Sequence, residues 1–398
     1  MIIMRKRLFI LTNDPVPYGT ANANYIRNFS KAVVNAGWGV IVIGMKLDDS
    51  QSGFYQVFDN TEHIQYWNLN ETKLGGKNYL RTYFCYAKKY QLAMKRFEVN
   101  EQDYVFVYST ELATAKAAIK TKIIPDSHKS YSEVEWFQPY QYKYGRFNPL
   151  YILWVIGFRY RAKKFVKAIP ISGNIEKYCK SHGCKSLVVP AMIDTKDEYL
   201  SKVHSEDSFV HFVYPGSASD KDSFPCMIKA LAELSGDEKN IVRFHLTGSM
   251  SKQKLLQIIG NDKQLELLEK VLVFHGWMEY DELMELYQKS DYLLLARAKN
   301  IVTISNFPSK VPEMMSYGII PVCSKVGDYT DIYLKDGINS IQFYEDDVVE
   351  CVAAIRRAIK VKKTHQNIQM SINARKTAEN CFDCAVWGEK ITEFLQMP

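Results

Sequence analysis

Short apolar runs alternate with amphipathic stretches along the first half of the chain. The run Arg7–Thr12 predicts a buried strand. From Ala21 to about Asn35 the apolar residues recur every three or four positions, which is the spacing of a helix. Val40–Ile43 predicts a second strand, so this segment is typical of a strand–helix–strand unit in a parallel sheet. Further strands are predicted at Tyr104–Tyr108 and Leu187–Val189.

The second half repeats the same alternation of strands and helices. Strands are predicted at Phe209–Tyr214, Val242–Leu246, Val271–Phe274, Tyr292–Leu295 and Ile319–Cys323. Helices are predicted at Phe224–Leu234, at Asp281–Lys289 and from Pro308 or Ser309 to Tyr317. Each half is therefore expected to form its own doubly wound α/β domain. The boundary is expected near 194–208, a stretch rich in charge and poor in apolar residues.

Composition narrows the class of protein without identifying it. The chain has 398 residues, 47% of them apolar, which is too long for one core and too apolar for disorder. Its eight cysteines do not form a disulfide framework, and reduced thiols suit a cytosolic protein. Cys381 and Cys384 form one C-x-x-C without the second pair that zinc needs. No apolar run is long enough to span a bilayer, and residues 1–11 resemble a first strand and not a signal peptide.

Charge is distributed unevenly between the two halves. Residues 1–200 contain 28 Lys and Arg against 17 Asp and Glu, a net charge of +11, whereas the remainder has a net charge of −4. Two stretches of the basic half, Tyr79–Phe97 and Tyr140–Lys167, interleave aromatic and basic residues. Each is either a helix with a core face and a solvated basic face, or a surface that contacts anionic lipid headgroups. Nucleic acid is disfavoured because no recognised nucleic-acid module appears.

Candidate binding residues follow the predicted strands, because ligands of open α/β sheets bind at the carboxyl ends of the strands. Neither the dinucleotide fingerprint nor a Walker A motif is present. Lys221, in the loop after the strand that ends at Tyr214, can neutralise a phosphate. The segment 297–318 supplies small polar residues, Lys310 and a helix start that favours a diphosphate. Glu313 can accept hydrogen bonds from a ribose diol, although a plain Pro-initiated helix with a solvated Glu explains the same pattern.

Several short motifs occur in a characteristic order over about 140 residues of the second half. They are Tyr214-Pro-Gly216, Lys221-Asp222, Leu246-Thr-Gly248, Phe274-His-Gly276, Asp281–Tyr287, Ser290-Asp291, Pro308-Ser-Lys310, Glu313–Gly318, Pro321-Val322 and Asp336–Asn339. In this order they resemble the nucleotide-sugar half of GT-B glycosyltransferases, and glycosyltransferase family 4 most closely. The first half matches more loosely, through the Gly19 loop, Asn35–Val40, Ile171-Ser172 and Val188–Asp194.

The resemblance implies a GT-B fold, in which two Rossmann-like doubly wound domains face a central cleft. It implies that Glu313 binds the donor ribose, that Lys221 meets the diphosphate, and that the backbone of 307–310 cradles the same group. The family commonly has a second Glu eight positions earlier, where this chain has Ser305, and an Arg where it has Ser217. The donor-binding residues implied are Gly19, Gly216, Ser217, Lys221, Gly248, Ser305, Asn306, Phe307, Ser309, Lys310 and Glu313.

The acceptor side is expected in the first half. A strand predicted at Ile123-Ile124 precedes Asp126 and His128, and a His at the carboxyl end of a strand can bind the transferring sugar or move a proton. The family often has a His–acid pair here, whereas this chain has Lys129 after the His. A purely structural His128 is the alternative. Tyr18, Asp126 and His128 are the expected acceptor-side residues, and His128, Lys221 and Glu313 the expected catalytic ones.

The sequence therefore predicts a metal-independent, cofactor-free glycosyltransferase in the cytoplasm, with retention of configuration implied by the resemblance. It would move a sugar from a nucleotide-diphosphate sugar to a glycan or lipid-linked acceptor, in the synthesis of a surface polysaccharide such as lipopolysaccharide or capsule. Domains are expected at 1–195 and 200–379, with a helix at 380–398 that packs back on the first. Peripheral binding to the inner membrane face is expected, and nucleic acid is not. A nucleotide-sugar 2-epimerase and a non-catalytic sugar-nucleotide or glycan binding protein are the alternatives.

Overall fold

The chain divides into two compact units. A computed structural model describes residues 6–17, 20–46, 53–56, 63–72, 78–109, 111–196, 207–216, 221–248, 251–260 and 262–398. The first unit comprises residues 1–194 and 383–398, and the second comprises residues 195–382. None of the helices in these ranges is long and apolar enough to cross a membrane.

The first unit is built on an eight-stranded sheet in its described part, with strand order β3-β4-β2-β1-β5-β6-β7-β8. All neighbours are parallel except β3 and β4. The strands are β1 (Arg7–Pro15), β2 (Gly39–Lys46), β3 (Gly53–Gln56), β4 (Ile64–Thr72), β5 (Tyr104–Tyr108), β6 (Lys129–Ser132), β7 (Lys167–Ala168) and β8 (Lys185–Ser186). The helices are α1 (Ala21–Asn35), α2 (Asn78–Arg96), α3 (Leu112–Lys120), α4 (Pro149–Val155), α5 (Gly173–Ser181) and α15 (Cys384–Gln396), with short helical turns at 126–128, 139–141, 145–147 and 156–164.

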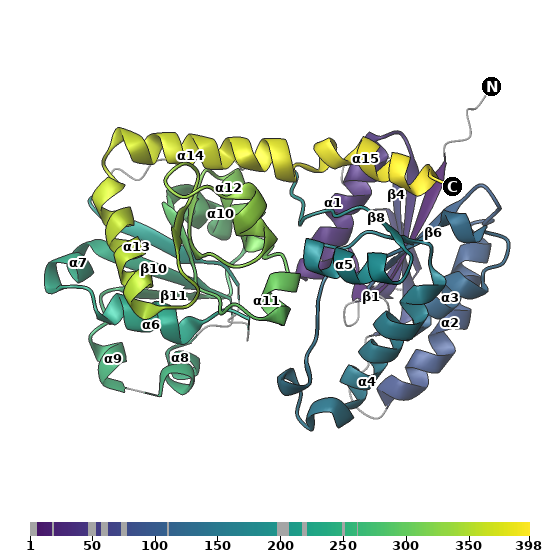
Figure 1. Cartoon of the computed structure of the whole chain (residues 1–398), viewed down its shortest axis with the longest axis horizontal. Coiled ribbons are helices and arrows are strands. Elements are labelled where there is room, and N and C mark those ends of the chain that lie inside the picture. The colour runs from purple at the N-terminus through teal and green to yellow at the C-terminus, as the bar shows by residue number, and fades with distance from the viewer. Residues whose placement is uncertain are drawn as a thin grey trace. The chain divides into compact units, whose positions relative to one another are not determined.

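The second unit contains a parallel sheet with the order β11-β10-β9-β12-β13-β14. Helices α6 and α8 cover one of its faces and α10 and α12 the other (Figure 1). Its strands are β9 (Val210–Tyr214), β10 (Val242–Thr247), β11 (Leu272–Gly276), β12 (Tyr292–Leu295), β13 (Ile320–Ser324) and β14 (Ile341–Phe343). Its helices are α6 (Phe224–Ala232), α7 (Gly236–Ile241), α8 (Lys252–Ile259), α9 (Asp262–Glu266), α10 (Tyr280–Lys289), α11 (Ile301–Ser305), α12 (Lys310–Ser316), α13 (Val348–Val361) and α14 (His365–Thr377), with helical turns at 329–333 and 378–382.

Burial explains why the strong apolar patterns became these elements. Every residue of β5 is buried, as expected for a central strand of a parallel sheet that helices cover on both faces. On one face Phe29 of α1 stacks on Phe106 of β5 with ring centroids 4.4 Å apart. The predicted helix Ala21–Asn35 and the strands Tyr104–Tyr108 and Tyr292–Leu295 are confirmed residue for residue.

Two strand predictions in the first unit are wrong. Residues 123–124 form a turn, and the strand begins only at Lys129. The strand predicted at Leu187–Val189 lies earlier, at Lys185–Ser186, although the amides of Leu187 and Val189 still donate to Ala168 and Pro170 of the neighbouring segment. Both segments are at the weaker end of the sheet, where strands of two to four residues leave too short an apolar pattern to place an edge.

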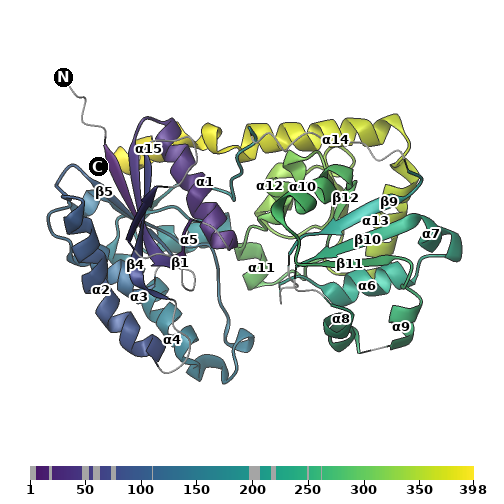
Figure 2. The ribbon, with the colours of Figure 1, turned by 180° about the vertical axis from the view of Figure 1, so that it is seen from behind.

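The last helix of the chain is held against the first unit. Helix α15 lies beside α1 in both Figure 1 and Figure 2. The two helices approach closely at Gly388, where a Cβ atom would lie 2.3 Å from the carbonyl oxygen of Ala32. The buried ammonium group of Lys167 donates to the carbonyl oxygens of Leu395 and Ser127, each at 2.7 Å, and to that of Met397. A cation at this position satisfies the last carbonyl groups of α15.

Three histidines form a hydrogen-bonded row across β9, β10 and β11. His211 Nδ1 lies 2.9 Å from His245 Nε2, and His245 Nδ1 lies 2.9 Å from His275 Nε2. Asp207 accepts from His211 Nε2 at 2.9 Å. One proton between each pair of nitrogens is enough to make both hydrogen bonds of the row. Burial, together with the neighbouring His211, His275 and Arg243, lowers the pKa of His245 to about 3.

This depressed pKa makes the stability of the fold pH-dependent. Between pH 6.5 and 3 the unfolded chain binds a proton at His245 that the folded chain excludes, so stability falls as the pH falls. From pH 7 to pH 5 we expect wild type to lose about 1–2 kcal/mol more than His245→Gln, measured by urea unfolding. The exposed His365→Gln serves as the control and should follow wild type. Equal pH dependence in wild type and His245→Gln would contradict the assignment.

Candidate functional site at the carboxyl edge of the second sheet

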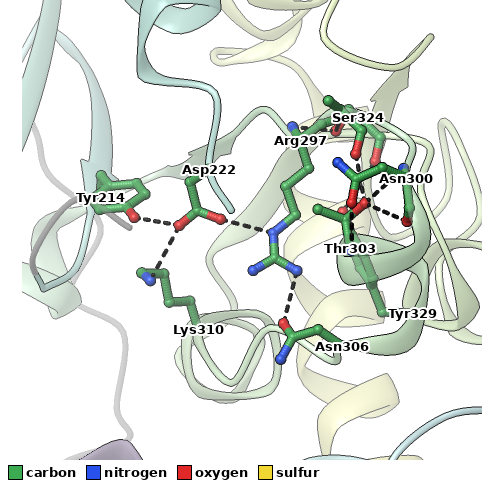
Figure 3. A network of polar contacts seen from close by, with 10 residues as sticks. Tyr214, Asp222, Arg297, Asn300, Thr303, Asn306, Lys310, Ser324 and Tyr329 are labelled. Carbon is green, nitrogen blue, oxygen red and sulfur yellow. Dashed lines mark hydrogen bonds and ion pairs between the residues drawn. The ribbon is translucent and has the colours of Figure 1, made fainter. Parts of the chain in front are cut away.

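The carboxyl ends of β9, β12 and β13 are joined by a buried polar network (Figure 3). Its centre is Asp222, whose carboxylate is fully buried and accepts from Arg297 Nε at 2.8 Å. The same carboxylate accepts from the hydroxyl of Tyr214, at the end of β9. Lys310 Nζ lies 3.5 Å from it, and 4.8 Å from the centre of the Tyr214 ring. One acid thus holds an arginine and a lysine at this edge.

Arg297 connects this acid to the loop that precedes α12. Its Nη1 donates to Asn306 Oδ1 at 3.0 Å. Its backbone amide donates to Ser324 Oγ at 2.7 Å, and that hydroxyl donates back to the Arg297 carbonyl oxygen at 3.0 Å. Because Ser324 ends β13 and Arg297 follows β12, the two neighbouring strand ends are fixed to each other. The intervening helix α11 is capped by Asn300, whose side chain accepts from the amides of Val302 and Thr303.

The ionisation of the network follows from its burial and its charges. Burial opposes a charge on Asp222, but the charges of Arg297 and Lys310 and the hydrogen bonds from Tyr214 and Arg297 outweigh it, so its pKa falls to about 2. Burial lowers the pKa of Lys310, and Asp222 offsets only part of this effect. Burial lowers the pKa of Arg297, but the charge and hydrogen bond of Asp222, together with Tyr329 and Tyr214, outweigh it, so the pKa is raised. Asp222 and Arg297 are therefore both ionised throughout the neutral pH range.

Most of the predicted donor-binding residues lie along this edge. Gly216 has a φ of 82°, which favours glycine, and its amide donates to Thr247 Oγ1 at 2.9 Å, next to Gly248. Lys221 is half-buried and directly precedes Asp222. Asn306 and Lys310 belong to the network, and Ser305 is buried at the end of α11. Ser309 precedes α12.

The structure differs from the predicted donor site in two details, the side chain of Phe307 and the length of helix α12. The Phe307 side chain packs among the rings of Tyr329, Tyr333 and Phe382 at 5.7–6.1 Å, so only its backbone is available to a ligand. Helix α12 has only seven residues, which limits what its dipole contributes. Half-buried Glu313 lies within this helix, near enough to Lys310 to act on its charge. The cations, more than the helix end, make this edge suitable for an anion.

Gly19, Ser217 and Tyr18 lie outside the described residues. His128 and Asp126 lie in the turn before β6, at the amino end of that strand, so the prediction that they follow a carboxyl end is wrong. The cause is the misplaced strand at 123–124. His128 stacks on Tyr104 with ring centroids 4.1 Å apart, and its Nδ1 lies 3.2 Å from the carbonyl oxygen of Asp103. Asp126 pairs with Lys129 at 2.7 Å.

The carboxyl edge of the first sheet carries a polar cluster that the sequence analysis missed. Asp14, at the end of β1, accepts from Asn22 Nδ2 at 3.1 Å, and Asn22 in turn accepts from the Tyr108 hydroxyl at 3.1 Å. Asn13 donates to Glu111. The sequence signal that could have indicated this cluster is a pair of polar residues, Asn13 and Asp14, directly after a buried apolar run.

Two further glutamates approach the same edge from the segment after β6. Glu133 is buried, and Glu133 and Glu135 both act on Tyr108. Burial is the main reason why the pKa of Tyr108 is raised well above its usual value, and Asp14 and the two glutamates add to it. Carboxylates from two strand ends, those of β1 and β6, therefore act on one tyrosine at the end of β5.

The comparisons with known proteins agree with this arrangement. Residues 196–377 match the family described as "Glycosyl transferases group 1". A sucrose-phosphate synthase from Thermosynechococcus elongatus is 13% identical, with 98% of this chain and 99% of that chain covered and a TM-score of 0.76. The fold is GT-B.

Other structures with the GT-B arrangement match over similar lengths. HepE from Anabaena, solved in complex with UDP and glucose, is 16% identical with 98% and 99% of the two chains covered and a TM-score of 0.66. WaaG, a glycosyltransferase involved in lipopolysaccharide biosynthesis, is 12% identical with 98% and 100% covered and a TM-score of 0.65. Among curated proteins, none matches.

The contribution of the buried ion pair between Asp222 and Arg297 to stability can be measured directly. Replacing Asp222 with Asn leaves Arg297 buried without its counter-charge, so we expect a loss of about 3 kcal/mol in the free energy of unfolding. The matched control is Asp336→Asn, which removes the half-exposed ion pair with Arg357 and should cost less than about 1 kcal/mol. Urea unfolding measures both. Equal losses would show that the network does not stabilise this edge.

Proposed function

We propose that this chain is a glycosyltransferase that moves a sugar from a nucleotide-diphosphate sugar to a glycan or lipid-linked acceptor. The observation that carries the proposal is the cation-rich carboxyl edge of the second sheet, in the segment that matches group 1 glycosyltransferases. Lys221 and Lys310 would neutralise the diphosphate, and Glu313 would bind the ribose. Relatives in fold include a protein solved with UDP and glucose and one involved in lipopolysaccharide biosynthesis, which favours surface polysaccharide synthesis as the setting.

The proposed chemistry needs charge stabilisation and no metal or other cofactor. When the bond between the anomeric carbon and the diphosphate breaks, negative charge grows on the leaving phosphate, and fixed cations lower the energy of that state. Asp222 and Arg297 would act as positioning residues, since they hold Lys310 and Asn306. The attacking hydroxyl would pass its proton to the departing phosphate on the same face, which retains configuration. We place the acceptor at the Asp14–Asn22–Tyr108 cluster and not at His128.

A donor screen tests the proposal. We expect one nucleoside diphosphate, with its sugar conjugates, to raise the melting temperature in a thermal-shift series, because a ligand at 100 times its Kd stabilises by about 2.7 kcal/mol. Glu313→Gln and Lys221→Met should each weaken binding about tenfold, measured by calorimetry. The exposed Glu266→Gln is the control. Unchanged binding in both site variants would refute the assigned site.

The same assay separates the alternatives. Transfer of sugar to an added lipid-linked acceptor, with the anomeric configuration read by NMR, supports the proposal. Conversion of the donor to an epimer without any acceptor would instead identify a 2-epimerase. The replacement of two family residues by Ser305 and Ser217 favours the binding-protein alternative, which predicts tight donor binding without turnover.

We also propose that the first unit contacts an anionic membrane surface from the cytoplasmic side, through residues 139–164. The inner side of this segment packs as an aromatic cluster that includes Trp136, Trp154 and Phe158. Its outer side leaves Tyr140, Tyr144 and Phe147 exposed by 70–72%. The stretch therefore has the core face and the exposed basic face of the first alternative, and the exposed rings are what supports the second, contact with lipid headgroups.

Cations accompany these exposed rings. Lys143 lies 5.4 Å from the centre of the Tyr144 ring, and Arg146 lies 5.2 Å from that of Phe147. Aromatic rings favour the headgroup region, and each Lys or Arg near an anionic surface contributes about 1 kcal/mol. A surface that combines the two is suited to anionic lipid.

Vesicle co-sedimentation tests this surface. At low salt we expect binding to vesicles of mixed anionic and zwitterionic lipid, weakened by added salt. The double change Lys143→Gln with Arg146→Gln should lower the partition coefficient about thirtyfold, since two cations contribute about 2 kcal/mol. Lys252→Gln with Lys270→Gln, two exposed lysines of the second unit, is the matched control. Absence of binding at low salt would overturn the proposal.

A further inference from the structure

A basic pocket of about 420 Å³ opens in the first unit, at the amino ends of the strands and thus opposite the carboxyl edge of the sheet. It lies between the C-terminal half of α2 and the end of α3, which pack against each other. Four lysines line it, namely Lys88, Lys95, Lys120 and Lys122. Its volume is in the range of small-molecule sites. Because α2 leads into β5 and α3 returns from it, the pocket is on the amino side of the strands, away from Asp14 and Tyr108.

Local sequence explains why the lysines converge. Lys88, Leu92 and Lys95 are four and three residues apart, so they form one stripe along α2. Lys120 is the last residue of α3, and Lys122 lies in the turn that follows. Two helix ends therefore bring their cations to one hollow.

These lysines contribute little to the fold, although the charge of Lys122 acts together with that of Lys129 on Asp126. Lysines in the last turn of a helix commonly bind its terminal carbonyl oxygens. Among the hydrogen bonds and ion pairs between described residues, none involves any of these four ammonium groups. Only one carboxylate, that of Glu98, is among the residues that line the pocket. Four like charges around one small space repel each other, and an anion would remove this repulsion.

Apolar side chains border the same space. Leu92 is 56% exposed and Ile123 is 52% exposed, which leaves hydrocarbon beside the ammonium groups. Lysine binds phosphate as a compact point charge. From the four cations and this apolar border we infer that the pocket binds a phosphate monoester, carried either by a lipid headgroup or by a free phosphorylated compound. The inference does not depend on the proposed transferase activity, because none of these residues belongs to either carboxyl edge.

Calorimetry on the full chain tests the pocket with two probes, a water-soluble short-chain phosphatidate below its micelle concentration and inorganic phosphate. We expect the double variant Lys95→Gln with Lys122→Gln to weaken binding at least tenfold. The control is Lys252→Gln with Lys270→Gln, two exposed lysines of the second unit, which should leave binding unchanged. Circular dichroism melting confirms that the variants are folded.

The two probes distinguish the sources. Tighter binding of phosphatidate, lost in Leu92→Ser with Ile123→Ser, supports a lipid headgroup. Binding of both probes with equal affinity, lost only when the lysines change, supports a free phosphorylated compound. No binding of either probe, or binding that the lysine variant leaves intact, overturns the inference. None of these outcomes depends on whether the chain transfers sugar.

Discussion

The ion pair between Asp222 and Arg297 is the interaction on which the carboxyl edge of the second sheet depends. Both charges are almost fully removed from water, and neither would be stable there alone. Their pairing places Tyr214, Lys310 and Asn306 on three different segments within reach of one carboxylate or one guanidinium. The edge is thereby preorganised before any ligand arrives, which is the property that electrostatic catalysis needs.

The carboxyl edge of the first sheet carries a different kind of polar group. There the groups around Tyr108 are carboxylates and amides. Such groups suit the hydroxyls of a sugar better than a phosphate. The net charge of each half of the chain therefore does not predict the charge of the polar groups at its strand ends. The more acidic half presents cations at its strand ends, whereas the more basic half presents carboxylates there.

The sequence predicted the parts of the fold that local pattern determines. Helix α1 and strands β5 and β12 have strong periodicity or unbroken apolar runs, and their bounds are correct. The motif order also led to the right fold, and two residues that it singled out, Lys310 and Asn306, belong to the network around Asp222 and Arg297. The short strands β6 to β8 lack such a pattern, so the strand before His128 was misplaced and the residue was assigned to the wrong edge. The pairing of Asp222 with Arg297 spans 75 residues, and no local pattern shows which buried acid a buried arginine meets.

Hydrogen–deuterium exchange with and without the nucleoside diphosphate found in the donor screen tests whether the edge held by Asp222 and Arg297 binds the donor. We expect the ligand to slow exchange at residues 214–216 and 306–313, which contain the end of β9 and the start of α12. Unchanged exchange in both segments, with protection elsewhere in the chain, would contradict this assignment of the donor site.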